Sequence, residues 1–162
     1  MQWQGKKTAF LALSVTLGLI LSYVEALIPV FAGVPGMKPG LSNILIVFLL
    51  FRYGIAEAAT VNLLRILIAG ILFGNPFSIV YSLSGAVFAI IGMALLKRTG
   101  MFSVYGVSMA GGMLHNAGQI LVAAFIVENY NIVLYLPVLI VSGCITGFIV
   151  GFIGGVIIKR VR

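Results

Sequence analysis

The sequence predicts an all-α integral membrane protein, in which six helices cross the bilayer and form a single domain over residues 1–162. Hydrophobic residues make up 62% of the chain and charged residues only 8%, whereas a soluble domain has about 25% charged residues. The mean hydropathy is +1.22, and long apolar runs alternate with short polar hinges, as in polytopic helical proteins. The two-residue alternation that a β-barrel needs is not sustained anywhere in the chain.

The predicted helices cover about residues 8–30, 41–53, 56–74, 77–96, 104–127 and 134–158. The first is expected to be a retained helix, because its apolar run is longer than a signal peptide's and no A-x-A cleavage pattern follows it. The second has roughly 13 residues, or about 20 Å of helix, against a hydrocarbon core of about 30 Å. We therefore expect it to be tilted, buried among its neighbours, or extended by the preceding loop. That loop, 32–40 (AGVPGMKPG), is too rich in Gly and Pro for regular helix.

The basic residues predict that both termini are cytoplasmic. With the N-terminus inside, one basic residue, Lys38, falls in an outer loop. The inner ends carry Lys6, Lys7, Arg52, Lys97, Arg98, Lys159, Arg160 and Arg162. We expect a multi-pass protein in the cytoplasmic membrane of a prokaryote. The net charge of +7 does not indicate a nucleic-acid partner, because the basic residues stand at helix ends and do not line one face.

Glycine recurs at every fourth position of the last helix, at Gly143, Gly147, Gly151 and Gly155. Four residues turn an ideal helix by about 400°, so the glycines form one slowly winding groove. In lipid, such small residues let two helix backbones pack closely. The groove is a predicted helix-packing surface, and the sequence leaves open whether the partner helix belongs to this chain or to another protein.

A weaker line of small residues lies in the first helix, at Ser14, Gly18 and Ser22. These residues are also four apart and therefore share a face. We assign them as a candidate face for docking a partner protein, with packing inside the bundle as the alternative.

A few polar side chains occur where lipid should exclude them. Arg65 stands in the middle of the third segment, where a charge costs about 2.5–3.5 kcal/mol on insertion scales. The candidate substrate-binding residues are Arg65, Lys38, Asn43, Asn62, His115, Asn116, Gln119 and Glu25. Together they predict a polar cavity in the outer half of the bundle, roofed by the 32–40 loop. The alternative is that Arg65 pairs with Glu25 and the amides only hold helices together.

Catalysis and cofactor binding have little support in the sequence. The chain contains no aspartate, and its acids are Glu25, Glu57 and Glu128. No Walker A motif is present, so ATP is not bound in the usual P-loop. The single cysteine, Cys144, excludes an internal disulfide and a cysteine-based metal cluster. We expect no enzyme, no cofactor and no metal; an intramembrane enzyme would have to use Glu25 and His115 as its acid–base pair.

Five motifs follow one another along the chain: GVPGMKPGLSNI, RILIAGILFGNPFS, SLSGAV, GVSMAGGMLHNAGQILVA and YLPVLIVSGCITGFIVG. In this combination the chain closely resembles the Gx transporter family, which is also described as heptaprenyl diphosphate synthase component I. The resemblance covers nearly all of the chain, from about residue 8 to 158.

That family in turn resembles the substrate-binding S components of energy-coupling factor (ECF) transporters. The resemblance implies a six-helix bundle with cytoplasmic termini and a substrate pocket near the outer face, often gated by the loop between the first two helices. It also implies association with a membrane coupling protein and two cytoplasmic ATPases, commonly through an A-x-x-x-A pattern in the first helix. Here Ser14, Gly18 and Ser22 stand in place of that pattern.

The leading hypothesis is therefore a substrate-binding membrane subunit of a vitamin- or metabolite-type importer, dependent on partner ATPases. Its substrate is expected to carry an anionic or strongly hydrogen-bonding head. The alternative is a non-catalytic membrane partner or anchor of a polyprenyl (heptaprenyl) diphosphate synthase or a related quinone-pathway or redox enzyme. The chain cannot itself hold the magnesium of such a synthase through clustered aspartates, because it has none.

Overall fold

The computed structural model describes residues 2–28 and 40–161, and in these ranges the chain is entirely helical apart from its turns. The helices are α1 (Gln2–Leu27), α2 (Leu41–Arg52), α3 (Ile55–Phe73), α4 (Pro76–Thr99), α5 (Val104–Ile126), the short 3-10 helix η1 (Tyr130–Tyr135) and α6 (Leu136–Arg160). The all-α prediction is confirmed. The loop 32–39, including Lys38, lies outside the described residues.

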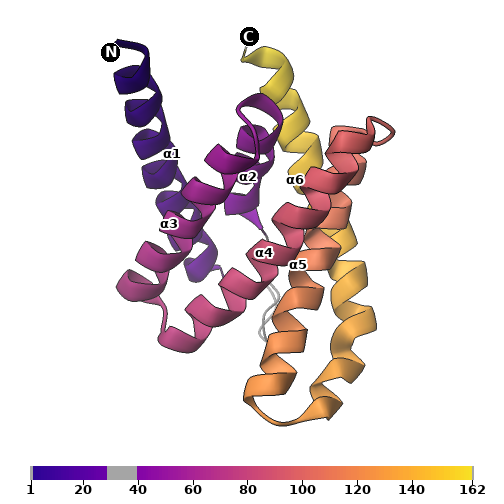
Figure 1. Ribbon diagram of the computed structural model, residues 1–162. Helices are drawn as coiled ribbons and strands as arrows, with labels where there is room; N and C mark the ends of the chain where they lie inside the picture. Colours follow the sequence, from indigo (N-terminus) through magenta and orange to yellow (C-terminus); the bar gives the residue numbers. More distant parts are fainter. Residues whose placement is uncertain (1, 29–39, 162) are drawn as a thin grey trace.

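Five of the helices, α1, α3, α4, α5 and α6, are long and apolar enough to cross a membrane. The protein is therefore a multi-pass membrane protein. The chain reaches one end of the bundle at both termini, at the α2–α3 turn and at the α4–α5 turn (Figure 1). The basic residues of the described chain, Arg65 excepted, gather at this end, which we call the basic end.

Several helix boundaries differ from the prediction, among them those of α1, α4 and α6. α1 begins at Gln2, six positions before the expected start, and it includes Gly5 and the two lysines that precede the apolar run. α4 continues to Thr99, since Lys97 and Arg98 suit the negative end of the helix dipole and Gly100, at φ 69°, ends it. α6 begins only at Leu136, because the preceding residues form η1.

The short helix α2 is the centre of the bundle. Its 12 residues span about 18 Å, so it cannot cross a hydrocarbon core of about 30 Å. Ile46, Val47, Leu49 and Leu50 are each at most 1% exposed, and α2 packs against α1, α3 and α6. Of the three arrangements expected for this segment, burial among its neighbours is the one that the structure shows.

The C-terminal end of α2 is held by a lysine from α4. Lys97 Nζ donates a hydrogen bond to the Leu50 carbonyl oxygen at 2.6 Å and lies 5.2 Å from the centre of the Phe51 ring. The last carbonyls of a helix have no partner inside the helix, so this contact satisfies one of them with a charged donor.

Replacing Lys97 with methionine should therefore lower the free energy of unfolding by about 1–2 kcal/mol, since the carbonyl loses a charge-assisted hydrogen bond. Thermal unfolding in detergent measures the change. Lys159→Met, an exposed lysine in the last turn of α6, is the control and should differ from wild type by less than about 0.5 kcal/mol. Equal shifts in the two variants would contradict a role for the α4–α2 contact.

The glycine groove of α6 faces α5 of the same chain. Its members, all buried, are Gly143, Gly147, Gly151 and Gly155. A Cβ atom on Gly143 would lie 2.5 Å from the carbonyl oxygen of Gly112, and one on Gly147 would lie 2.6 Å from that of Ser108. Backbone touches backbone here, so only glycine fits, and the partner that the sequence left open is α5.

The line of small residues in α1 faces inward, which corrects its assignment as a docking face. Ser14 and Gly18 are buried. A Cβ atom on Gly18 would lie 3.0 Å from Arg65 Cδ and 3.4 Å from Leu45 Cδ2. Ser22 accepts a hydrogen bond from Arg65. The line therefore packs on α2 and α3 inside the bundle.

Candidate functional site

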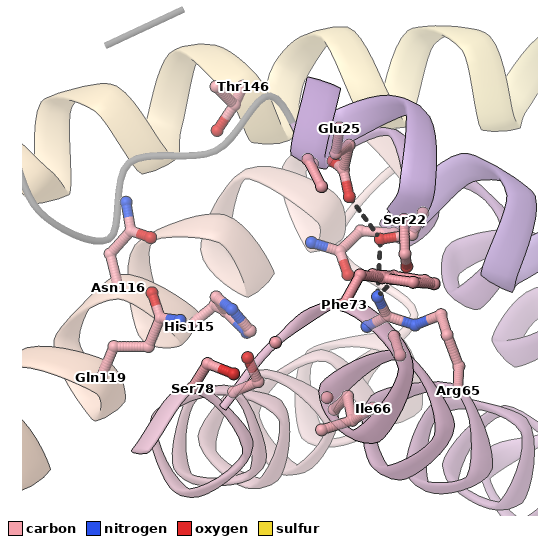
Figure 2. Close-up of a pocket in the computed structure, with 18 of the residues that line it drawn as sticks. Ser22, Glu25, Arg65, Ile66, Phe73, Ser78, His115, Asn116, Gln119 and Thr146 are labelled. Atoms are coloured by element: carbon pink, nitrogen blue, oxygen red, sulfur yellow. Dashed lines mark hydrogen bonds between the residues drawn. The ribbon is translucent and has the colours of Figure 1, made fainter. Parts of the chain in front are cut away.

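A cavity of about 310 Å³ lies between α1, α3, α4 and α5, in the half of the bundle away from the basic end (Figure 2). The N-terminal residues of α2 form its floor, and α6 contributes at one edge. Its polar lining consists of Ser22, Glu25, Ser42, Asn43, Arg65, Asn75, Ser78, Ser82, His115, Asn116, Gln119 and Thr146. These side chains come from all six α-helices and from the turn before α4, so the fold as a whole is needed to build the site.

Arg65 is only 8% exposed, and its guanidinium donates four hydrogen bonds to neighbouring side chains. Its Nε and Nη2 atoms both donate to Asn62 Oδ1, at 3.2 and 2.6 Å, because the two residues lie on one face of α3. Its Nη1 atom donates to Ser22 Oγ of α1 at 2.9 Å and to Ser42 Oγ of α2 at 2.8 Å. Arg65 thus joins three helices at one edge of the cavity.

Glu25, from the last turns of α1, completes this cluster. One carboxylate oxygen accepts a hydrogen bond from the Leu41 amide at the start of α2, and the other accepts one from Ser42 Oγ at 2.9 Å. The carboxylate therefore caps α2, where the positive end of the helix dipole favours a negative charge. Ser42 stands between Glu25 and Arg65 and bridges the two charges, because it donates to the carboxylate and accepts from the guanidinium.

The opposite wall of the cavity is built by α5. Figure 2 shows His115 projecting from this helix toward the Arg65 side, with Asn116 and Gln119 beside it. Asn116 Nδ2 donates to the carbonyl oxygen of Leu139 in α6 at 2.7 Å. α5 can approach α4 closely because Gly85 of α4 has no side chain. A Cβ atom at this position would lie 2.8 Å from the His115 carbonyl oxygen. Glycine in α4 thus sets the position of this wall.

The turn between α3 and α4 supplies polar groups that the sequence reasoning missed. Asn75 Oδ1 accepts from the Ser78 amide at 2.8 Å, and Ser78 Oγ accepts from the Asn75 amide at 3.0 Å. This reciprocal cap, followed by Pro76, starts α4. The motif GNPFS could have predicted the helix start, but nothing in it shows that Asn75, Ser78 and Ser82 line a cavity.

The predicted site residues divide into three groups. Six of them line the cavity: Glu25, Asn43, Arg65, His115, Asn116 and Gln119. Asn62 is buried behind this lining, and its side-chain oxygen holds the Arg65 guanidinium in place. Lys38 lies outside the described residues. The structure thus brings together six residues from α1, α2, α3 and α5, and it gives Asn62 a supporting position.

Comparison with known proteins decides the family. The family described as heptaprenyl diphosphate synthase component I matches residues 14–157, most of the chain. The chain belongs to this family. No curated protein and no solved structure matches the chain. Its resemblance to ECF S components therefore stays a prediction, and its activity has to be argued from the cavity.

Proposed function

We propose that this protein is the substrate-binding membrane subunit of a small-molecule importer that depends on partner ATPases. The observation that carries the proposal is the polar cavity of about 310 Å³ inside a membrane bundle. Its size is at the lower end of the range for small-molecule pockets, about 300–1,000 Å³. Polar and charged side chains inside a membrane protein are costly, and they commonly mark a solute site.

The position of the cavity supports import. The positive-inside rule orients the basic end toward the cytoplasm, so the cavity at the other end would open toward the outside. The half of the bundle near the basic end is filled by the side chains of α2. A solute bound in the cavity therefore meets a packed core before it could reach the cytoplasm. Passage would need a rearrangement, and the chain has no P-loop to drive one with ATP.

The first test asks whether the cavity carries a ligand. Protein purified gently from its native membrane should release a small molecule on denaturation, detected by mass spectrometry. Ala69 lines the cavity, and Ala69→Phe would fill part of it, so we expect at least about tenfold less of that compound. Ala9→Phe, on the exposed side of α1, is the matched control and should retain it. Release of nothing beyond lipid and detergent by the wild type would contradict the proposal.

The family description favours a second function, a non-catalytic membrane partner of a polyprenyl diphosphate synthase. Such a partner needs no ligand in the cavity, and the synthase would supply the magnesium-binding carboxylates. Affinity purification from native membranes separates the two proposals. A membrane coupling protein and ATPases should co-elute with an importer subunit, whereas a soluble synthase should co-elute with an anchor.

A further inference from the structure

We infer that the solute held in the cavity carries no net charge and is bound through paired hydrogen-bond donors and acceptors next to an apolar surface. The inference rests on the proposed function and names the class of substrate. It follows from the hydrogen bonds that already hold the two charged side chains of the cavity. It also follows from the neutral polar side chains that remain available to bind a ligand.

Among the described residues that line the cavity, the formal charges cancel. Among the described lining residues, Glu25 and Arg65 are the two with a formal charge when His115 is neutral. They lie on the same side and share Ser42 as a bridge. A ligand in the cavity therefore faces a compensated pair and not an isolated cation.

Both members of this pair already have protein partners. Each oxygen of Glu25 accepts a hydrogen bond from α2. A guanidinium has five N–H groups, and Arg65 uses four of them in the hydrogen bonds to Asn62, Ser22 and Ser42. One N–H, on Nη2, is left for a ligand among the described residues. A single N–H is far from the bidentate fork by which arginine selects carboxylates and phosphates.

The polar groups that remain available are neutral. The side chains of Asn43, Ser82 and Gln119 line the cavity and make no hydrogen bond to any residue that the structure describes. Asn116 uses its amide nitrogen for Leu139, which leaves its side-chain oxygen as an acceptor. Carboxamides and hydroxyls offer both donors and acceptors, so their natural complement is a group that also has both, such as an amide, a urea or a heterocyclic ring.

An apolar surface adjoins these groups. Ile66, Ala69 and Phe73 line the cavity from α3, and Figure 2 shows Phe73 and Ile66 beside Arg65. An anion placed here would approach the Glu25 carboxylate and find one N–H for its charge, and a cation would approach Arg65. Moving an ion out of water without a full set of partners is strongly unfavourable. A neutral solute with a hydrogen-bonding edge and an apolar face avoids both costs.

The test combines the charge of the released compound with two amide-to-leucine variants. Compounds released from wild-type protein are analysed by mass spectrometry in positive and negative ion modes and by electrophoretic mobility at pH 7. Gln119→Leu removes a free amide of the cavity and should reduce the recovered compound about tenfold. Asn131→Leu, an exposed amide in η1 outside the cavity, should recover as much as wild type.

The outcomes separate the inference from the function on which it rests. A compound without net charge, lost in Gln119→Leu and kept in Asn131→Leu, supports the inference. A released anion or cation that depends on the cavity would overturn the inference and leave the importer proposal standing. Equal recovery of a neutral compound from both variants would show that the free amides do not bind it, which also overturns the inference. No released compound at all would overturn both proposals.

Discussion

Replacing Arg65 with alanine should lower the free energy of unfolding by about 3–5 kcal/mol, the range for removing one member of a buried charge pair. The side chain is 8% exposed, and its loss would remove four hydrogen bonds, two of which join α3 to α1 and α2. The buried side-chain oxygen of Asn62 would lose the hydrogen bonds that Arg65 donates to it. Glu25 would keep its two partners in α2, but it would no longer have a compensating positive charge nearby.

Thermal and denaturant unfolding in detergent can measure this effect with a thiol-reactive dye. The chain has a single cysteine, Cys144, which is half-buried in α6, so its reaction with the dye reports opening of the bundle. Arg52→Ala is the matched control, because Arg52 is exposed at the end of α2. It should stay within about 0.5 kcal/mol of wild type. A loss below about 1 kcal/mol for Arg65→Ala would contradict the structural role of the cluster.

A double-variant cycle tests whether Glu25 and Arg65 act as one unit. Glu25→Gln alone should also be destabilising, because it leaves Arg65 without its compensating charge. The combined variant Glu25→Gln with Arg65→Ala should lose less stability than the sum of the two single variants, by roughly 1–3 kcal/mol, since residues in one network are coupled. Strict additivity would show that the bridge through Ser42 does not transmit the interaction.

Replacing Gly143 with alanine should lower the free energy of unfolding by about 2–3 kcal/mol, even though alanine is the better helix former by about 1 kcal/mol. The added Cβ atom would lie 2.5 Å from the Gly112 oxygen and 2.7 Å from the Gly112 carbonyl carbon. Both are backbone atoms of α5, so no side chain can rotate away. The two helices would have to separate, and the dispersion contacts along their seam would weaken.

Gly5→Ala is the matched control for this substitution. Gly5 also lies inside an α-helix, but a Cβ atom there would meet nothing within 4 Å. We expect wild-type stability or a slight gain from the higher helix propensity of alanine. If Gly143→Ala were as stable as Gly5→Ala in the same unfolding measurement, the close α5–α6 contact would not exist in the membrane protein.

The sequence predicted the helical architecture well because lipid constrains it strongly. Backbone polar groups must be satisfied inside a helix when no water is present, so apolar runs translate directly into helices. The short second segment also stood out, since Gly40 and the glycines and prolines before it cannot extend the helix. Helix ends were less predictable, because the lysines before the first apolar run continue α1 at no cost in a polar layer.

The site was predictable as a set of residues but not as a geometry. Arg65, Glu25 and the amides are conspicuous in an apolar chain, so their identity follows from composition alone. Which side chains they face depends on how each helix is rotated about its axis. Ser14 and Ser22 show this, since their spacing is compatible with an outward or an inward face. Only the packed structure places Ser22 on Arg65 and Ser42 between the two charges.

The brevity of α2 has a consequence for the cell that carries the protein. Its 12 residues span about 18 Å, and six apolar side chains of α2 are buried in the half of the bundle near the basic end. Such a packed apolar layer offers no polar path for protons or sodium ions through the described part of the chain. We therefore expect the protein to be abundant in an energised membrane without dissipating the ion gradients across it.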